Sequence, residues 1–202
     1  MLARLDRYSS QPGHGANGPD LADLSRGVAA QPGLLGYLTF RQLAGPAAVC
    51  LTLWDTEASA TGPCGGLAAP PSEMYQVTDT QEGPAAAQGP AYARLVYFDG
   101  PRAPEQAVAE DLAGRRRIWP AIRRLSGLVG VYVLRGRDLS SVVVTLATSV
   151  DTLDAAQRAV MATELAPGED PALLPGPDRV EIHCVTGYHL PASASAPSTR
   201  GH

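Results

Sequence analysis

One histidine of the chain lies where it could take part in proton-transfer chemistry. His183 is one of four histidines, and it stands in an alternating stretch that is typical of a strand. An imidazole that titrates near neutral pH could accept the proton of a phenol and make that ring more reactive toward oxygen. Tyr97, Trp119 and Tyr188 could direct further polar atoms into a cavity shared with His183. The alternative for His183 is a hydrogen-bonded strand histidine without a chemical role.

The composition excludes several other kinds of chemistry. All 16 basic residues are arginines, so no lysine is present for a Schiff base or a phosphate loop. Cys50, Cys64 and Cys184 lack metal-ligand spacing, and we expect buried thiols in a reducing cytoplasm. No nucleophile triad, metal cluster or dinucleotide motif occurs, so we predict neither a metal nor a cofactor.

Charge and hydropathy limit the partners. The net charge of −4 argues against nucleic acid, which requires a basic surface. The first residues are too polar for a signal peptide, and no apolar run approaches the length of a membrane span. We therefore expect a cytoplasmic protein that binds neither nucleic acid nor a membrane.

The elements that must position these residues occur twice. Short matches recur at nearly constant offsets in the two halves of the chain, namely Gly33 with Gly127, Gly36 with Gly130, Thr52–Leu53 with Thr145–Leu146, and Ala3–Leu5 with Ala93–Leu95. Alternating or apolar stretches predict strands at residues 1–8, 33–40, 47–54, 73–79, 93–99, 128–135, 141–148 and 179–188. Helical spacing predicts helices at 20–30, 104–125, with a kink at Pro120, and 151–165.

Each half therefore has the order β-α-β-β-α-β, and the predicted fold class is α+β with two ferredoxin-like units. The Gly- and Pro-rich stretch 61–71 allows only about one helical turn after Glu57, so the first unit lacks most of its second helix. We predict units at 1–80 and 92–190, a linker at 81–91 and a disordered tail at 191–202. Two such sheets can cover their apolar faces by packing on each other, which predicts an intramolecular dimeric α+β barrel. Association of two chains into a further homodimer stays open.

Strand parity separates two sets of side chains on the third strand. Val49, Leu51 and Leu53 should fill the barrel, whereas Cys50, Thr52 and Trp54 should face the helical side and contact substrate there. The equivalent face of the second half carries Val143, Thr145 and Ala147. These side chains are smaller and lie beneath two full helices, so we expect the larger cavity at Thr145.

Several of these residues resemble the antibiotic biosynthesis monooxygenase (ABM) family of dimeric α+β barrels. The resemblance lies in the segments Pro32–Gly36, Leu51–Ala58 and Glu73–Val77. It implies cofactor-independent oxidation of phenols, with Trp54 as a wall for a flat aromatic ligand, although Trp54 could also be a packing residue. The family's Asn and Tyr positions are occupied here by Cys50 and Ala60, and the residues of its haem-degrading members are absent.

These observations lead to one main expectation and two alternatives. The main expectation is a cofactor-independent monooxygenase for an aromatic or polyketide-like substrate, with His183 and Trp54 as catalytic residues; the resemblance implies a setting in secondary metabolism. One alternative is a non-catalytic protein that binds a hydrophobic small molecule. The other is an interaction module for another subunit.

Overall fold

Eight strands form a closed antiparallel barrel in the computed structural model, which describes residues 1–8, 27–29, 31–45, 47–61 and 72–191. Their order around the barrel is β1-β3-β2-β8-β5-β7-β6-β4. The bounds are β1 Leu2–Tyr8, β2 Leu34–Gln42, β3 Ala48–Trp54, β4 Ser72–Glu82, β5 Tyr92–Phe98, β6 Leu128–Arg135, β7 Ser141–Ala147 and β8 Arg179–His189. The strands predicted from the sequence are thereby confirmed, with small differences at their ends.

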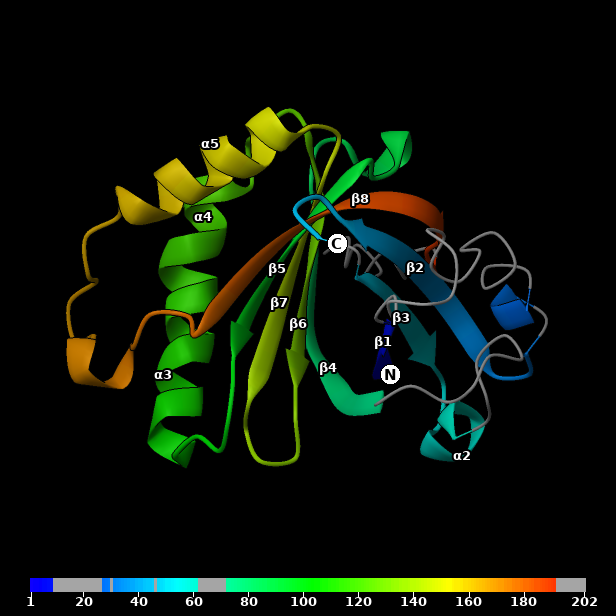
Figure 1. Cartoon of the computed structure of the whole chain (residues 1–202). Coiled ribbons are helices and arrows are strands. Elements are labelled where there is room, and N and C mark those ends of the chain that lie inside the picture. Colours follow the sequence, from blue (N-terminus) through cyan, green and yellow to red (C-terminus); the bar gives the residue numbers. More distant parts are fainter. Residues whose placement is uncertain (9–26, 30, 46, 62–71, 192–202) are drawn as a thin grey trace, which may run out of the picture.

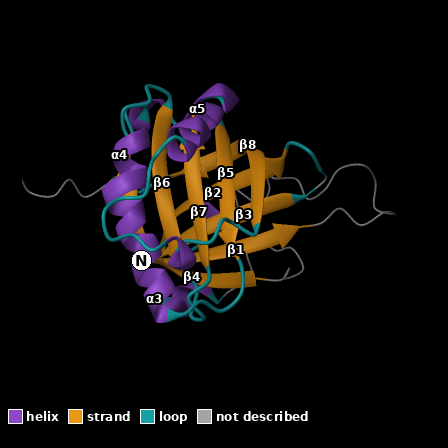
Figure 2. Ribbon diagram, turned by 90° about the vertical axis from the view of Figure 1, so that its left-hand side faces the viewer, coloured by secondary structure: helices purple, strands orange, loops and turns teal. Residues whose placement is uncertain are grey.

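The barrel is closed by two contacts between strands that are distant in sequence. The first four strands are neighbours in the order β4-β1-β3-β2, and the last four are neighbours in the order β8-β5-β7-β6. Pairing of β2 with β8 and of β4 with β6 joins these two groups (Figure 2). The α+β class and the closed antiparallel barrel therefore agree with the sequence prediction.

Among the described residues, helices cover one side of the barrel far more fully than the other (Figure 1). On that side lie α3 Pro104–Ala113, α4 Trp119–Ile122 and α5 Val150–Met161, and on the other α2 spans only Glu57–Ala60. The single turn expected after Glu57 is confirmed. None of the helices in the described ranges combines the length and the apolar character needed to cross a membrane.

The long helix predicted over 104–125 is interrupted as expected, but by a wider turn. Residues Gly114–Ile118, labelled η2, are π-helical and join α3 to α4. Pro120 lacks an amide hydrogen, and its ring would collide with the carbonyl of Arg116 in a regular α-helix. A π-helical turn before the proline accommodates the ring without ending the helix.

The segments predicted as a linker and a tail have different outcomes. The linker 81–91 begins with the end of β4 and contains the 3₁₀ helix η1, Ala86–Gln88. The amides of Gly83 and Ala85 donate to Val129 and Leu128 of β6, so this segment is held against the barrel. Residues 192–202 of the predicted tail, and most of the helix expected at 20–30, lie outside the described residues.

The repeated glycines have the same local surroundings in both halves. The amide of Asp55 donates to the carbonyl of Gly33 at 3.1 Å, and the amide of Thr148 donates to that of Gly127 at 2.9 Å. The next residue caps a helix in each half, since Thr56 accepts from the Ser59 amide and Ser149 from the Thr152 amide. A bulge lies between Leu34 and Gly36 in β2 and between Leu128 and Gly130 in β6.

A second repeated feature lies where the two groups of strands meet. The hydroxyl of Thr78 donates to the carbonyl of Val133 at 3.3 Å, and that of Thr186 donates to the carbonyl of Thr39 at 3.1 Å. Both threonines lie at irregularities in strand register, in β4 and β8 respectively. The two closures of the barrel thus use the same threonine-to-carbonyl bond.

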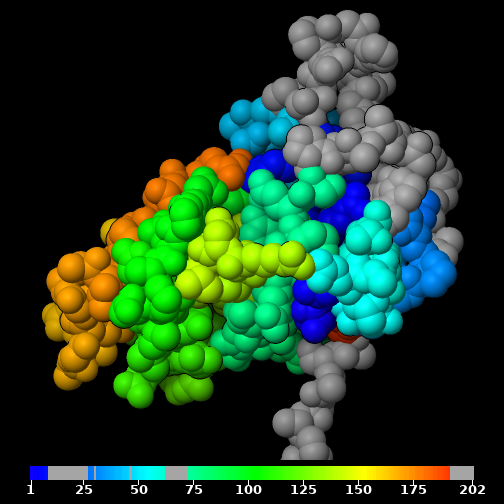
Figure 3. All heavy atoms as spheres, turned by 90° about the horizontal axis from the view of Figure 1, so that it is seen from below, coloured from blue at the N-terminus to red at the C-terminus, as the bar shows by residue number. Residues whose placement is uncertain are grey.

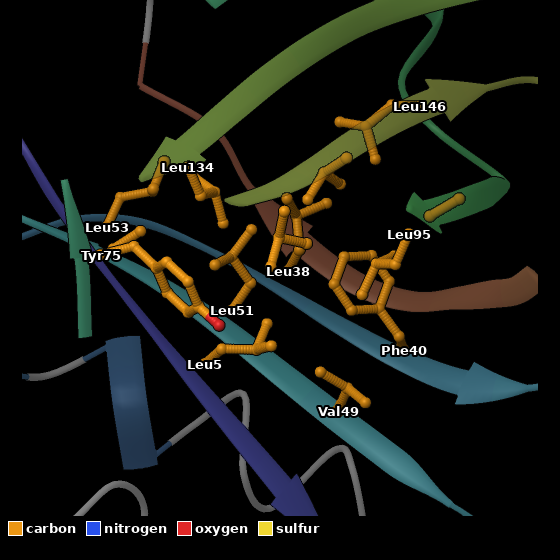
Figure 4. Close-up of a cluster of buried hydrophobic side chains, with 14 of the residues drawn as sticks. Leu5, Leu38, Phe40, Val49, Leu51, Leu53, Tyr75, Leu95, Leu134 and Leu146 are labelled. Carbon is orange, nitrogen blue, oxygen red and sulfur yellow. The ribbon is translucent and has the colours of Figure 1, made fainter. Parts of the chain in front are cut away.

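Aliphatic side chains fill much of the barrel interior. Figure 4 shows side chains of β1, β2 and β3 directed toward those of β5, β6 and β7. Val49, Leu51 and Leu53 of β3 belong to this core, as strand parity predicted. Each fully buried leucine contributes about 1.5–3 kcal/mol to folding, before the loss of conformational entropy is considered.

Candidate functional site

Three of the predicted site residues lie on the outer face of the first half and are inaccessible. Cys50, Thr52 and Trp54 all have no exposed surface, and Cys50 and Trp54 pack with Val28 and Ala60. The indole Nε1 of Trp54 donates to the Thr52 hydroxyl at 2.8 Å, which satisfies its single polar atom. This geometry is that of a packing tryptophan, the alternative left open by the sequence.

Two more predicted residues lie beneath the helices of the second half. Trp119 packs against the cluster that contains Ile122, Leu128 and Ala156, and Thr145 is about nine-tenths buried on the same side of the barrel. Apolar side chains therefore occupy the face where we expected a cavity. Neither of the two pockets described below is lined by Trp119 or Thr145.

The expected location of His183 and Tyr97 in a helix-covered cavity was wrong, because both side chains point into the barrel. Tyr97 belongs to the interior cluster, and His183 is paired with Ala93 of that same cluster. The His183 ring is fully buried, 5.8 Å from the ring of Phe40. At the start of β8 the inward residues Glu181 and His183 are therefore polar, while Val180 on the other face is 48% exposed.

Glu181 is the centre of a polar cluster at the barrel end where β8 begins. Its carboxylate accepts from the Tyr97 hydroxyl at 3.3 Å and from Arg179 Nη1 at 2.5 Å, and it lies 3.2 Å from His183 Nε2. Arg7 of β1 reaches the same carboxylate at 3.4 Å and stacks over the Tyr97 ring. Opposite charges thus compensate each other in a largely buried site.

The electrostatics of this cluster favour the ionised carboxylate. Burial alone would raise the pKa of Glu181, but the bond with His183 and the charges of Arg7 and Arg179 outweigh it, lowering the pKa to about 2. Burial raises the pKa of the Tyr97 phenol, so this group stays protonated and donates. The cluster therefore joins β1 and β8 through charged groups and β5 through the neutral phenol of Tyr97.

A pocket of about 550 Å³ opens at the other end of the barrel, where β4 and β8 end and β6 begins. We call it the barrel-mouth pocket. It is lined by Thr80, Gln81, Glu82, Ala86, Ala87, Gly89, Val129, Gly130, Tyr132, Leu146, Tyr188, His189, Leu190 and Pro191. Its volume lies in the range typical of small-molecule sites. Of the predicted site residues it contains Tyr188.

The barrel-mouth pocket combines an aliphatic part with phenols and a carboxylate. Tyr132 pairs with Thr80 across two strands, and it packs against the interior cluster. Burial, and secondly the charge of Glu82, raise the pKa of Tyr132, so its phenol is a hydrogen-bond donor at neutral pH. Among the residues that the structure describes, no ion pair joins Glu82 to another side chain. The site can therefore offer both a donor and an acceptor to a bound hydroxyl group.

Tyr132 and Glu82 were missed in the sequence analysis. Glu82 lies in the stretch that composition identified as a linker, and Tyr132 is one aromatic residue within an apolar strand. The two residues are far apart in sequence, and only the pairing of β4 with β6 brings them together. The repeat offsets were the available signal, since they indicate two equivalent units whose edge strands must meet when a barrel closes.

A second recess, of about 410 Å³, lies at the opposite end of the barrel. It is lined by residues of β4, of the loop after β5 and of the hairpin between β6 and β7, including Glu73, Tyr75, Asp99 and Ser140. Seen from below, this hairpin reaches toward the segment that carries α2 (Figure 3), and Arg137 forms an exposed ion pair with Glu57 there. The recess is polar and lacks the aliphatic lining of the barrel-mouth pocket.

No family model matches the sequence, and no curated protein matches it. Solved structures do match in fold. A putative monooxygenase from Fusobacterium nucleatum subsp. nucleatum ATCC 25586 superposes with a TM-score of 0.64, at 9% identity over 94% of both chains. An anthrone oxidase-like protein gives 0.59, at 13% identity over 98% of this chain and 96% of the other.

A third similar structure names the fold directly. It is an uncharacterized ferredoxin fold protein related to antibiotic biosynthesis monooxygenases, from Listeria monocytogenes 4b F2365. Its TM-score is 0.53, at 8% identity over 92% of this chain and 95% of the other. At such identities these likenesses establish the fold of the chain. Within its described part, no three His, Cys, Asp or Glu side chains are arranged to hold a metal ion.

Proposed function

We propose that the protein binds a small, flat phenolic molecule in the barrel-mouth pocket and oxidises it as a monooxygenase without a cofactor. The observation that carries the proposal is the lining of the pocket, in which Tyr132, Tyr188 and Glu82 stand beside aliphatic side chains. Aliphatic and aromatic walls suit the faces of a fused ring system. The similarity in fold to a putative monooxygenase and an anthrone oxidase-like protein supports the oxidative reaction.

The polar groups have separate roles in this proposal. The Glu82 carboxylate accepts the hydrogen of a substrate hydroxyl, while the Tyr132 phenol donates to an oxygen of the substrate and stabilises negative charge there. An electron-rich ring of this kind can react with dioxygen directly. In an anthrone-like substrate a CH₂ group becomes a carbonyl; one atom of O₂ enters the product and the other leaves as water with the two hydrogens.

This proposal moves the proton acceptor from His183 to Glu82. His183 is fully buried and does not line the pocket, and Trp54 is fully buried on the outside of the barrel. Neither residue can contact a ligand in the barrel-mouth pocket. We therefore assign both residues to folding stability in this proposal.

We also infer that the chain consists of two ferredoxin-like units, 1–80 and 92–190, that close on each other as a dimeric α+β barrel of the ABM family does. The equivalent bonds at Gly33 and Gly127 and at Thr78 and Thr186 support this inference. They recur at the offsets that the sequence repeats predict. Such a chain needs no second copy to complete the barrel.

Oxygen consumption tests the proposed reaction. Purified protein would be incubated with anthrone or hydroquinone in air-saturated buffer while dissolved oxygen and the quinone spectrum are followed. We expect oxygen uptake that the Glu82→Gln variant reduces and that His183→Ala leaves unchanged per folded molecule. Binding of both compounds without any oxygen uptake would overturn the oxidative part of the proposal.

A non-catalytic binding protein is the second candidate. It is favoured by one observation, which is that no histidine stands beside Tyr188 as a base. Among the described residues the only histidine in the pocket lining is His189, and it lies on the opposite face of β8, near the Tyr37 ring. In this case the pocket would bind the phenol and protect it. Titration under nitrogen followed by admission of air separates the two candidates, because only the enzyme would then consume its ligand.

A further inference from the structure

The segment between β4 and β5 forms a fixed wall of the barrel-mouth pocket. Its backbone is tied to β6 by the Gly83 amide, which donates to Val129 at 2.9 Å, and by the Ala85 amide, which donates to Leu128 at 2.8 Å. Ala85 is fully buried, and the next residues, of η1, line the pocket. Because this wall is bonded along its length, a ligand can displace it only by breaking those bonds.

The Tyr188 side chain lies directly on that wall at Gly89. A Cβ atom at position 89 would overlap the phenolic oxygen and would lie 2.6 Å from Cζ of Tyr188. Gly89 has φ 75° and ψ 159°, a conformation that is essentially restricted to glycine. The contact between wall and ring thus depends on the absence of a side chain at this one position.

Tyr188 is well placed to control the room for a ligand. It is paired with Leu38 of the interior cluster, so its side chain stands on the pocket side of β8. It is 47% exposed, and its ring has a packed partner at Gly89. If Gly89 carried a side chain, the ring would have to leave the wall, and the pocket would change shape.

We infer that Tyr188, resting on Gly89, sets the width of the barrel-mouth pocket and selects planar fused-ring ligands by size. Gly89 is the specificity-determining partner, because the missing side chain lets the phenol end of Tyr188 approach the wall and keeps the pocket open. A flat three-ring phenol can then enter edge-on beside the Tyr188 ring. This inference rests on the proposed function, since it assumes that aromatic molecules bind in this pocket.

A comparison of binding by the wild type and by variants at the two positions tests the inference. Dissociation constants for hydroquinone, which has one ring, and for anthrone, which has three fused rings, would be measured by tyrosine fluorescence under nitrogen. The proteins are the wild type, Gly89→Ala, Tyr188→Ala and the double variant. Tyr188→Phe serves as the matched control, because it keeps the ring and removes only the hydroxyl.

We expect Gly89→Ala to weaken anthrone binding roughly tenfold relative to hydroquinone, the scale on which a pocket discriminates a small change in fit. The double variant should lose this selectivity change, because without the Tyr188 ring a Cβ at position 89 displaces nothing. Tyr188→Phe should retain the wild-type ratio. Comparing Tyr188→Ala with the double variant shows the effect of backbone strain at position 89 alone, because neither protein has a Tyr188 ring to displace.

The outcomes distinguish this inference from the proposed function. If the wild type binds anthrone but Gly89→Ala changes the two affinities equally, the selectivity role is overturned and the site stands. The selectivity role is also overturned if the effect of Gly89→Ala is undiminished in the double variant. If the wild type binds neither compound, both the proposed function and this inference fall.

Discussion

His183 Nε2 lies 3.2 Å from Oε2 of Glu181, and both side chains are directed into the barrel. The carboxylate also binds Arg7 and Arg179, so the histidine belongs to a charge-compensated cluster. The contact with Glu181 accounts for one ring nitrogen of this buried histidine, and Nδ1 has no hydrogen-bond partner among the described residues. The feature that first indicated catalysis is thus explained by the way the barrel end is held together.

Removal of the central carboxylate should destabilise the protein strongly. Glu181→Gln removes the carboxylate that binds Arg7 and leaves Arg179 only its 3.5 Å pair with Asp99, at a cost of about 2 kcal/mol in the free energy of unfolding. Urea unfolding at neutral pH measures this loss. Glu57→Gln, which breaks the exposed pair with Arg137, is the control and should cost less than about 1 kcal/mol. Equal losses in the two variants would contradict the role given to Glu181.

The same carboxylate should make stability depend on pH in the acid range. The pKa of Glu181 is lowered from 4.5 to about 2 in the folded protein, so the unfolded chain takes up its proton first as the pH falls. The stabilisation is therefore complete above about pH 4.5 and is lost between about pH 4.5 and 2. The difference in unfolding free energy between wild type and Glu181→Gln should shrink over this window. A difference that is constant from about pH 6 to about pH 3 would refute the assignment.

Trp54 should behave as a core residue. Trp54→Ala removes a fully buried side chain and should cost about 3–5 kcal/mol, because it leaves a large cavity. Thr52→Val keeps the volume but leaves the indole N–H without its acceptor, at a cost of about 1–3 kcal/mol. Thermal unfolding gives both values. Anthrone affinity of the folded Thr52→Val protein should equal that of the wild type, and a large loss of affinity would restore Trp54 as a ligand contact.

Replacement of Gly33, Gly100 or Gly127 by alanine should destabilise the protein for different reasons. A Cβ at Gly127 would lie 2.8 Å from Thr148 Oγ1, whereas Gly100 has φ 76° and no atom within 4 Å. Gly100→Ala should therefore cost about 1 kcal/mol from backbone strain alone. Gly33 combines φ 80° with a Cβ position 2.6 Å from Asp55 Oδ1, so Gly33→Ala should cost the most. Chemical denaturation of Gly33→Ala, Gly100→Ala and Gly127→Ala gives the ranking of the losses in unfolding free energy. A loss in Gly33→Ala no greater than that in Gly100→Ala would contradict this account.

The two polar groups of the barrel-mouth pocket should affect binding differently. Tyr132→Phe removes one hydrogen bond to the ligand oxygen and should weaken anthrone binding roughly fivefold to tenfold. Glu82→Gln keeps an acceptor but loses the charge, so it should affect oxygen uptake more than affinity. Affinity under nitrogen and oxygen uptake in air provide the two measurements. Ser140→Ala, in the recess at the other barrel end, is the control and should change neither.

Much of the fold could be predicted because local patterns determine it. The glycine and threonine repeats located the strands, the Gly- and Pro-rich stretch limited α2 to one turn, and parity separated Leu51 and Leu53 from Trp54 on β3. These features depend on neighbouring residues and on the period of a strand. They do not depend on how the two groups of strands meet.

The site could not be predicted in the same way. On β8 the apolar alternation of Val180 and Ile182 suggests that these residues face inward, yet Glu181 and His183 do so. Partners from β1 and β5 compensate those polar groups, and a single strand does not reveal them. The barrel-mouth pocket was missed because its wall is a segment whose composition resembles a linker but which hydrogen-bonds to β6. Both errors concern contacts between distant parts of the chain.

The closure of the barrel by β2 with β8 and by β4 with β6 also protects the molecule from edge-to-edge strand association. Every strand has a hydrogen-bonded neighbour on each side, so the described part of the chain presents no free strand edge that a foreign strand could extend. Loss of either of these two strand pairings, here called seams, would uncover two such edges at once, in a barrel rich in apolar side chains. Partial opening at one seam is therefore the step at which this protein would begin to aggregate.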